Sequence, residues 1–288
     1  MGLGPPILAL YRQLKLLGGF EGVHDVMELG AQAVWCPRHK LVQALFEAFN
    51  RPAPDAAMLD RFANWKGSGR ELYEALGLKY DCLDLDPSFG SLRFDLNLDS
   101  VPASHAGRYD FVTNHGTSEH LINQHNCFKV MHELCKPGGV MLHAVPFTVH
   151  LEHGFFNYQP NFFSALGRYN DYETLGIWVG PDWQLGSLVP WEKGLMEHFN
   201  MNARTTHLLV VLQKKLKDRP FGTPFQEIYE AMVPEETLAR YSIVIDGAGL
   251  GGDRGKYLED VPGRQLLDEL RKRIKNRILR KFGLSGSR

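Results

Sequence analysis

The middle of the chain, residues 108–146, switches between strand-like and helix-like spacing of apolar positions. The apolar run at 109–113 predicts a buried strand, the helical spacing at 123–135 predicts a helix that ends before Pro-Gly-Gly, and 140–145 is a second apolar run. Two strands joined by a crossing helix are parallel, and ligands bind beyond the carboxyl ends of such strands. The polar turn at 114–120 lies at such an end, so we expect chemistry there.

The same pattern continues on both sides of this unit. Apolar runs alternate with segments of helical spacing, which is typical of an open α/β sheet. A stretch with several Pro and Gly residues, near 50–77, indicates a helical insertion. Further strands are expected at 24–29, 80–85, 92–96, 175–179 and 206–212, the last two as an antiparallel edge, and further helices at 7–17, 37–49 and 157–169.

Composition adds little to this picture. The 288 residues have a formal net charge of −1 and are 44% hydrophobic, which is ordinary for a soluble globular protein and gives no argument for a nucleic-acid partner. Four cysteines in apolar contexts, without CxxC spacing, indicate buried free thiols and a cytoplasmic protein: Cys36, Cys82, Cys127 and Cys135. No apolar run reaches the roughly 20 residues that span a bilayer.

Acidic residues stand at the ends of three predicted strands. Glu28 precedes Gly30, where a glycine lets the backbone approach a ligand closely, although a simple tight turn would look the same. The carboxylate of Asp84 can accept both hydroxyls of a ribose. Asp95 can accept the exocyclic amine of an adenine while the next amide, that of Leu96, donates to the ring. An exposed loop carboxylate is the alternative at Asp95.

Six short motifs follow one another over residues 20–150: Glu28-Leu29-Gly30, Asp84, Asp95, Tyr109-Asp110-Phe111-Val112, Glu119-His120-Leu121 and Lys136-Pro137-Gly138-Gly139. Their order resembles the class I S-adenosylmethionine-dependent methyltransferases. The resemblance implies a Rossmann-like, seven-stranded, mostly parallel sheet with helices on both faces and one antiparallel strand. It also implies that S-adenosylmethionine lies across the carboxyl edge of that sheet.

The resemblance assigns roles to the strand ends. The motif at Glu28 would lie against the methionine moiety, Asp84 would hold the ribose and Asp95 would meet the adenine. We therefore expect the cofactor to contact Glu28, Gly30, Gln32, Asp84, Asp95, Leu96 and Asn114. Gln32 stands where the family has a second glycine. Either the cofactor is held differently here, or the Gln amide makes a contact of its own.

Several histidines follow the two predicted strands at 109–113 and 140–145. His115, His120 and His153 are candidate bases, because imidazole titrates near neutral pH and can take a proton from an acceptor. A structural role for His120 is the alternative. His153 also belongs to a group with His143, His150 and Glu152, for which a zinc or iron site is a minor alternative. We predict no metal.

The loop after the strand predicted at 140–145 is expected to form the acceptor pocket. Aromatic residues there would make an apolar pocket that suits a small organic acceptor. The residues expected to bind it are His150, Phe155, Asn157 and Tyr158.

The predicted function is methyl transfer to an oxygen or nitrogen of a small-molecule or sugar-like acceptor. Residues 1–216 would form the methyltransferase domain, and 217–288 a C-terminal extension packed on it. The basic helix at 264–281 leaves a nucleic-acid methyltransferase open as an alternative. Gln32 leaves open a pseudo-enzyme that binds the cofactor without turnover. The sequence does not indicate an oligomeric state.

Overall fold

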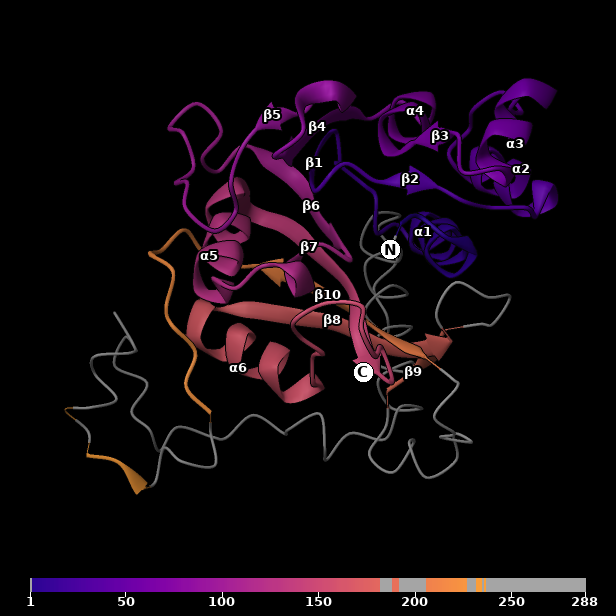
Figure 1. Ribbon diagram of the computed structural model, residues 1–288. Helices are drawn as coiled ribbons and strands as arrows, with labels where there is room; N and C mark the ends of the chain where they lie inside the picture. The colour runs from indigo at the N-terminus through magenta and orange to yellow at the C-terminus, as the bar shows by residue number, and fades with distance from the viewer. Residues whose placement is uncertain (1, 182–187, 192–205, 227–231, 235, 237–288) are drawn as a thin grey trace, which may run out of the picture.

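The computed structural model describes residues 2–181, 188–191, 206–226, 232–234 and 236. Their centre is an eight-stranded sheet with helices on both faces (Figure 1). The strand order is β5-β4-β1-β6-β7-β10-β8-β9. The strands are β1 Asp25–Leu29, β4 Lys79–Asp84, β5 Leu92–Arg93, β6 Tyr109–His115, β7 Cys135–Thr148, β8 Tyr172–Pro181, β9 Val189–Pro190 and β10 His207–Lys215.

The sheet is parallel on one side and mixed on the other. β1 pairs in parallel with β4 and β6, β4 with β5, and β6 with β7. β10 runs antiparallel to both β7 and β8. The predicted α/β class with one reversed strand inside a mostly parallel sheet is therefore confirmed, with eight strands rather than seven because the short β9 pairs with β8. The expectation that 175–179 and 206–212 close the sheet as an antiparallel edge is confirmed, since β8 and β10 pair antiparallel at this end of the sheet, with β10 between β7 and β8.

Successive side chains of a strand point to opposite faces of the sheet, so the core is divided into one cluster on each face. Val26 and Phe111 pack in one cluster with residues of α1 and α2, whereas Met27 and Val112 pack in the other with residues of α5 and α6. In Figure 1, α1 to α4 accordingly gather at the upper right, and α5 and α6 at the left. The helices are α1 Pro5–Leu16, α2 His39–Ala48, α3 Ala56–Ala63, α4 Gly69–Ala75, α5 Gln124–Leu134 and α6 Pro160–Asn170, with short 3₁₀ helices η1 Pro87–Phe89 and η2 Ser118–His120.

The segment near 50–77 holds α3, α4 and a two-residue strand, β3 Gly67–Ser68, which pairs with β2 Ala33–Val34. Both helices begin at a side-chain cap. Asp55 accepts a hydrogen bond from the Met58 amide at 2.7 Å, and the Ser68 hydroxyl accepts one from the Glu71 amide at 3.2 Å. These caps end the preceding loop and start each helix at a fixed residue.

Residues 217–226 continue from β10 and contact the helices beside it. Phe221 is buried, and the side chain of Asn170 binds both the amide and the carbonyl of Gly222. The basic helix predicted at 264–281 lies outside the described residues. All four cysteines are buried and free, as predicted. Among the described helices, none has the length and apolar character to cross a membrane.

Candidate active site

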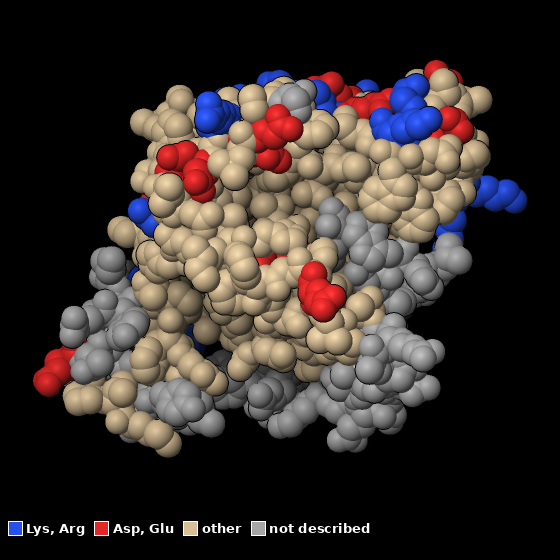
Figure 2. All heavy atoms as spheres, viewed as in Figure 1, with Lys and Arg blue, Asp and Glu red and all other residues tan. Residues whose placement is uncertain are grey.

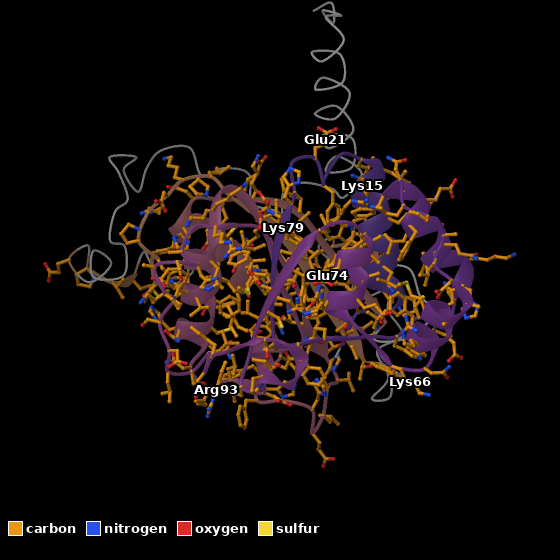
Figure 3. All side chains as sticks on the ribbon, turned by 90° about the horizontal axis from the view of Figure 1, so that it is seen from above. Lys15, Glu21, Lys66, Glu74, Lys79 and Arg93 are labelled. Carbon is orange, nitrogen blue, oxygen red and sulfur yellow. The ribbon has the colours of Figure 1, made fainter. Side chains whose placement is uncertain are left out.

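The strand order reverses at β1, because β4 lies on one side of it and β6 on the other. In open α/β sheets this switch point, at the carboxyl ends of the strands, is where ligands bind. Figure 3 shows the molecule from above. Lys79, at the start of β4, and Arg93, in β5, lie toward opposite ends of the parallel strands. Arg93 pairs with Asp84, the last residue of β4, so its side is the carboxyl edge.

Gly30 makes the turn that leaves β1 at this edge. Its φ is +70°, a conformation that side chains other than glycine's rarely adopt. A Cβ atom there would lie 2.5 Å from Thr117 Oγ1, so the position also lacks space for a side chain. The Gly30 amide donates to the Leu83 carbonyl at 2.8 Å. The turn after β1 is thus tied to β4 and packed against the turn after β6.

The turn after β6 is built by Asn114 and Thr117. Asn114 Oδ1 accepts from the amides of Thr117 and Ser118, at 3.3 and 3.1 Å, and Thr117 Oγ1 donates to the Leu29 carbonyl at 2.6 Å. Asn114 is fully buried and belongs to β6, which runs through His115. The expectation that Asn114 and His115 lie in the turn is therefore wrong.

The side chain of Gln32 folds back onto the protein. Its Nε2 donates to the Gly30 carbonyl at 3.1 Å and to Thr117 Oγ1 at 3.3 Å, and the residue is nearly buried. The Gln amide thus contacts the protein, and a contact between Gln32 and the cofactor stays a prediction. The contact strengthens the link between the turns after β1 and β6.

Glu28 lies behind this turn. Its Oε2 accepts from the Gln32 amide at 3.1 Å and from the Tyr80 hydroxyl at 2.5 Å, and its Oε1 has no hydrogen-bond partner among the described residues. Complete burial raises the pKa of this carboxyl from 4.5 to about 8. A direct contact between Glu28 and a cofactor stays a prediction, and the observed contacts organise the backbone of the turn.

Asp84 joins the turn after β4 to the turn after β1. Its Oδ2 accepts from the Ala31 amide at 2.7 Å and its Oδ1 from the Asp86 amide at 3.0 Å. An ionised carboxylate has about four lone-pair sites, so the partly exposed group keeps capacity for hydroxyl donors. The adjacent Leu85 is 62% exposed, an apolar surface at this edge that sequence pattern did not single out.

Asp95 and Leu96 follow β5 along the same edge. Asp95 is partly exposed, and its Oδ1 accepts from the Asn97 amide at 2.8 Å. Leu96 is buried, and its carbonyl accepts from Asn126 Nδ2 at 2.9 Å. The carboxyl edge therefore carries Gly30, Asp84 and Asp95 at the ends of three neighbouring strands, in the arrangement that the sequence predicts.

His115 lies inside the protein. Its Nε2 is 2.8 Å from the Tyr11 hydroxyl, which is 2.6 Å from that of Tyr73. Burial lowers the pKa of His115 to about 3, so the ring is neutral in ordinary buffers. Its role as a base stays a prediction, and the structure does not bring it together with the other two candidates.

His120 and His153 do come together, around Glu119. Glu119 Oε1 is 3.4 Å from His153 Nε2 and 3.9 Å from His120 Nε2. The Glu119 side chain is fully buried, whereas 47% of the His120 side chain and 32% of the His153 side chain are exposed. Burial lowers the pKa of both imidazoles. Sequence pattern placed Glu119 in a motif with His120 and His153 in a group with Glu152, and it did not predict that Glu119 meets His153, because only the folded loop brings His153 to η2.

The residues predicted to bind an acceptor divide into anchors and exposed positions. Tyr158 is buried, and its hydroxyl lies 2.9 Å from Ser118 Oγ and 2.6 Å from Gln124 Oε1, so it holds the loop on the turn after β6. His150 is nearly buried and packs its ring against His153.

Phe155 and Asn157 are exposed on the same loop. The amide of Phe155 donates to the Glu119 carbonyl at 2.8 Å. The loop after β7 therefore lies against η2, beside the carboxyl end of β6.

Figure 2 shows one face of the molecule in the orientation of Figure 1. The surface recedes in its centre, between the upper left part and the helices at the upper right. Lys and Arg are interspersed with Asp and Glu along the upper rim and do not gather in one basic patch on the described part of this face.

Comparison with known proteins gives structural matches only. No protein-family model and no curated protein sequence matches the chain. Similar solved structures include the 1,6-didemethyltoxoflavin-N1-methyltransferase of Burkholderia thailandensis (11% identity, TM-score 0.37, covering 73% of this chain and 80% of that one). A SAM dependent methyltransferase of Archaeoglobus fulgidus is 11% identical, with a TM-score of 0.39 and coverage of 72% and 93%.

A third similar structure is the 16S rRNA (adenine(1408)-N(1))-methyltransferase of Catenulisporales acidiphilia (10% identity, TM-score 0.36, coverage of 76% and 96%). All three are described as methyltransferases, the kind of enzyme that the motifs of this chain resemble. The function proposed below rests on the residues of this chain.

Proposed function

We propose that this protein is an S-adenosylmethionine-dependent methyltransferase that acts on an oxygen or nitrogen of a small organic or sugar-like acceptor. The observation that carries the proposal is the meeting of Gly30, Asp84 and Asp95 at the carboxyl edge, beside the switch point between β1 and β6. Gly30, Asp84 and Asp95 thus follow one another along one edge, in the order of methionine moiety, ribose and adenine that the resemblance implies.

The hydrogen-bonding groups at this edge match those of the cofactor. Gly30 makes the tight turn after β1 against Thr117, and Asp84 retains lone pairs for the two ribose hydroxyls. Asp95 and the amide of Leu96 match the exocyclic amine and ring nitrogen of adenine, and the exposed Leu85 provides apolar contact for the base. Gln32, held on Gly30 and Thr117, is compatible with this arrangement because its side chain is directed to the protein.

When bound, S-adenosylmethionine would supply an electrophilic methyl group: the acceptor atom would bond to the methyl carbon as the carbon–sulfur bond breaks, with its electron pair going to sulfur and the acceptor's proton to solvent or a base. The residues of this chain bind and align the two partners, and alignment alone can supply a large part of such a rate enhancement. His120 of η2 and His153 of the loop after β7 are partly exposed, and we expect them to meet the acceptor. Phe155 and Asn157 extend that acceptor side.

The test is formation of S-adenosylhomocysteine from S-adenosylmethionine by the full chain with a panel of hydroxyl and amine acceptors. We expect turnover with an oxygen or nitrogen acceptor and a fall in kcat for His153→Ala, with His39→Ala as the matched control on the exposed start of α2. Cofactor binding without turnover on any acceptor would favour the pseudo-enzyme alternative. Absence of cofactor binding would refute the proposal.

A further inference from the structure

Glu119, His120 and His153 form a compact group of side chains that offer one oxygen and two nitrogen ligands. Their ligand atoms all lie within 4.8 Å of one another. The three residues come from two segments: Glu119 and His120 from η2, and His153 from the loop after β7. Among the described residues this is the group of His, Cys, Asp and Glu side chains that is close enough to hold an ion.

The spacing of these atoms suits a metal of ordinary radius. Ligands bound at about 2.1 Å with angles near 90–109° lie roughly 3.0–3.4 Å apart. The distance from Glu119 Oε1 to His153 Nε2 is 3.4 Å, and that to His120 Nε2 is 3.9 Å. The carboxylate is buried and therefore fixed, whereas the two imidazoles are partly exposed, so small rotations of these rings bring all three donors to bonding distance.

The backbone around the group is shaped to hold it. Gly154 packs on Glu119 so closely that an added Cβ would lie 2.9 Å from Glu119 Cγ. The Phe155 amide donates to the Glu119 carbonyl at 2.8 Å. The neighbouring Glu152 and Val149 both have φ of +57°, an unusual conformation for Glu and a strained one for β-branched Val. Such strain clusters at functional sites, where the surrounding structure imposes it.

We propose that Glu119, His120 and His153 bind one divalent first-row transition-metal ion. Two imidazoles and one carboxylate are a ligand set that such ions prefer, and three protein ligands leave coordination positions open. Sequence pattern alone predicts no metal here, because the three ligands assemble only through the loop contact of Phe155 with Glu119.

The open positions give the ion a role, which rests on the proposed methyl transfer. A hydroxyl oxygen that binds a divalent ion has a lowered pKa and loses its proton to solvent more readily. The ion would thus select a hydroxyl acceptor and hold its oxygen beside η2, at the end of β6. His120 and His153 then act as ligands for the ion.

The test uses the full, untagged chain, freed of metal by a chelator and titrated with Co²⁺. Visible d–d absorption and calorimetry report the binding, and neither depends on turnover. We expect one Co²⁺ per chain, bound more than about 100-fold more weakly in His120→Ala, His153→Ala and Glu119→Gln, since even the loss of a group behind a ligand costs about 10- to 100-fold. His39→Ala should bind Co²⁺ like the parent.

Binding of S-adenosylhomocysteine to the same samples shows that each variant is folded and separates the two proposals. A chain that binds Co²⁺ through these ligands but does not bind S-adenosylhomocysteine would support the metal site and refute the proposed function. A chain that binds S-adenosylhomocysteine but not Co²⁺ would overturn the metal site. Equal Co²⁺ binding by the ligand variants and the parent would also overturn it.

Discussion

Glu28 provides a quantitative test of the structure around the turn after β1. Its carboxyl is completely buried, and one oxygen, Oε1, lacks a hydrogen-bond partner among the described residues. In the variant Glu28→Gln, a neutral amide of the same shape replaces a group that titrates. The Tyr80 hydroxyl can still donate to the amide oxygen, and the Gln32 amide can do the same.

The magnitude follows from the two pKa values of the carboxyl. Below pH 4.5 the group is protonated in both the folded and the unfolded chain, so its contribution to stability is fully present. Between pH 4.5 and about 8 the unfolded chain loses this proton while the folded chain keeps it, and the stability falls. At about 1.36 kcal/mol per pKa unit, the free energy of unfolding decreases by up to ~5 kcal/mol over this range.

The assay is urea unfolding of the parent chain and of Glu28→Gln at several pH values from 4.5 to 8. We expect the difference in unfolding free energy, parent minus variant, to fall by several kcal/mol as the pH rises, because every other titrating group is shared. Glu74→Gln is the control, since the Glu74 side chain is 52% exposed and should leave the pH dependence unchanged. Parallel pH curves for the parent and Glu28→Gln would contradict the assigned burial.

Two further substitutions test the turns at the carboxyl edge. Gly30→Ala should destabilise the protein by about 1–3 kcal/mol in thermal unfolding and abolish cofactor binding in calorimetry, because its Cβ meets Thr117. Gly22→Ala is the control: it has a similar φ of +74° but open space around it, so it shows the effect of the backbone conformation without the clash. Tyr158→Phe should cost about 1–3 kcal/mol in thermal unfolding, because Ser118 loses a buried partner, while an unchanged melting temperature would contradict its role as an anchor.

The parallel half of the sheet could be predicted because buried parallel strands consist of nearly continuous apolar runs. The runs predicted at 24–29, 80–85 and 109–113 also ended at or beside Gly30, Asp84 and the polar turn, so the carboxyl edge of the sheet followed from the pattern. The order of β8 and β10 did not follow, since an apolar strand carries no mark of its neighbours. In the folded protein β10 lies between β7 and β8.

Two features of the candidate site could not be predicted from sequence pattern: the environment of His115 and the pairing of His153 with Glu119. Placing the end of β6 two residues early put His115 in a polar turn, whereas the strand continues and directs the ring to Tyr11 in the interior. Side chains alternate between the two faces of a strand, so an error in its end changes the environment of a residue completely. The pairing of His153 with Glu119 depends on loop contacts that have no periodicity, and no local pattern could have predicted it.

The central claim, that the carboxyl edge holds S-adenosylmethionine, is tested most directly by calorimetric titration of the full chain with S-adenosylhomocysteine. We expect one molecule bound per chain, a large loss of affinity in Asp84→Ala, and unchanged affinity in Asp60→Ala, which removes an exposed carboxylate from α3. Absence of binding by the parent chain, or equal binding by the parent and Asp84→Ala, would contradict the claim.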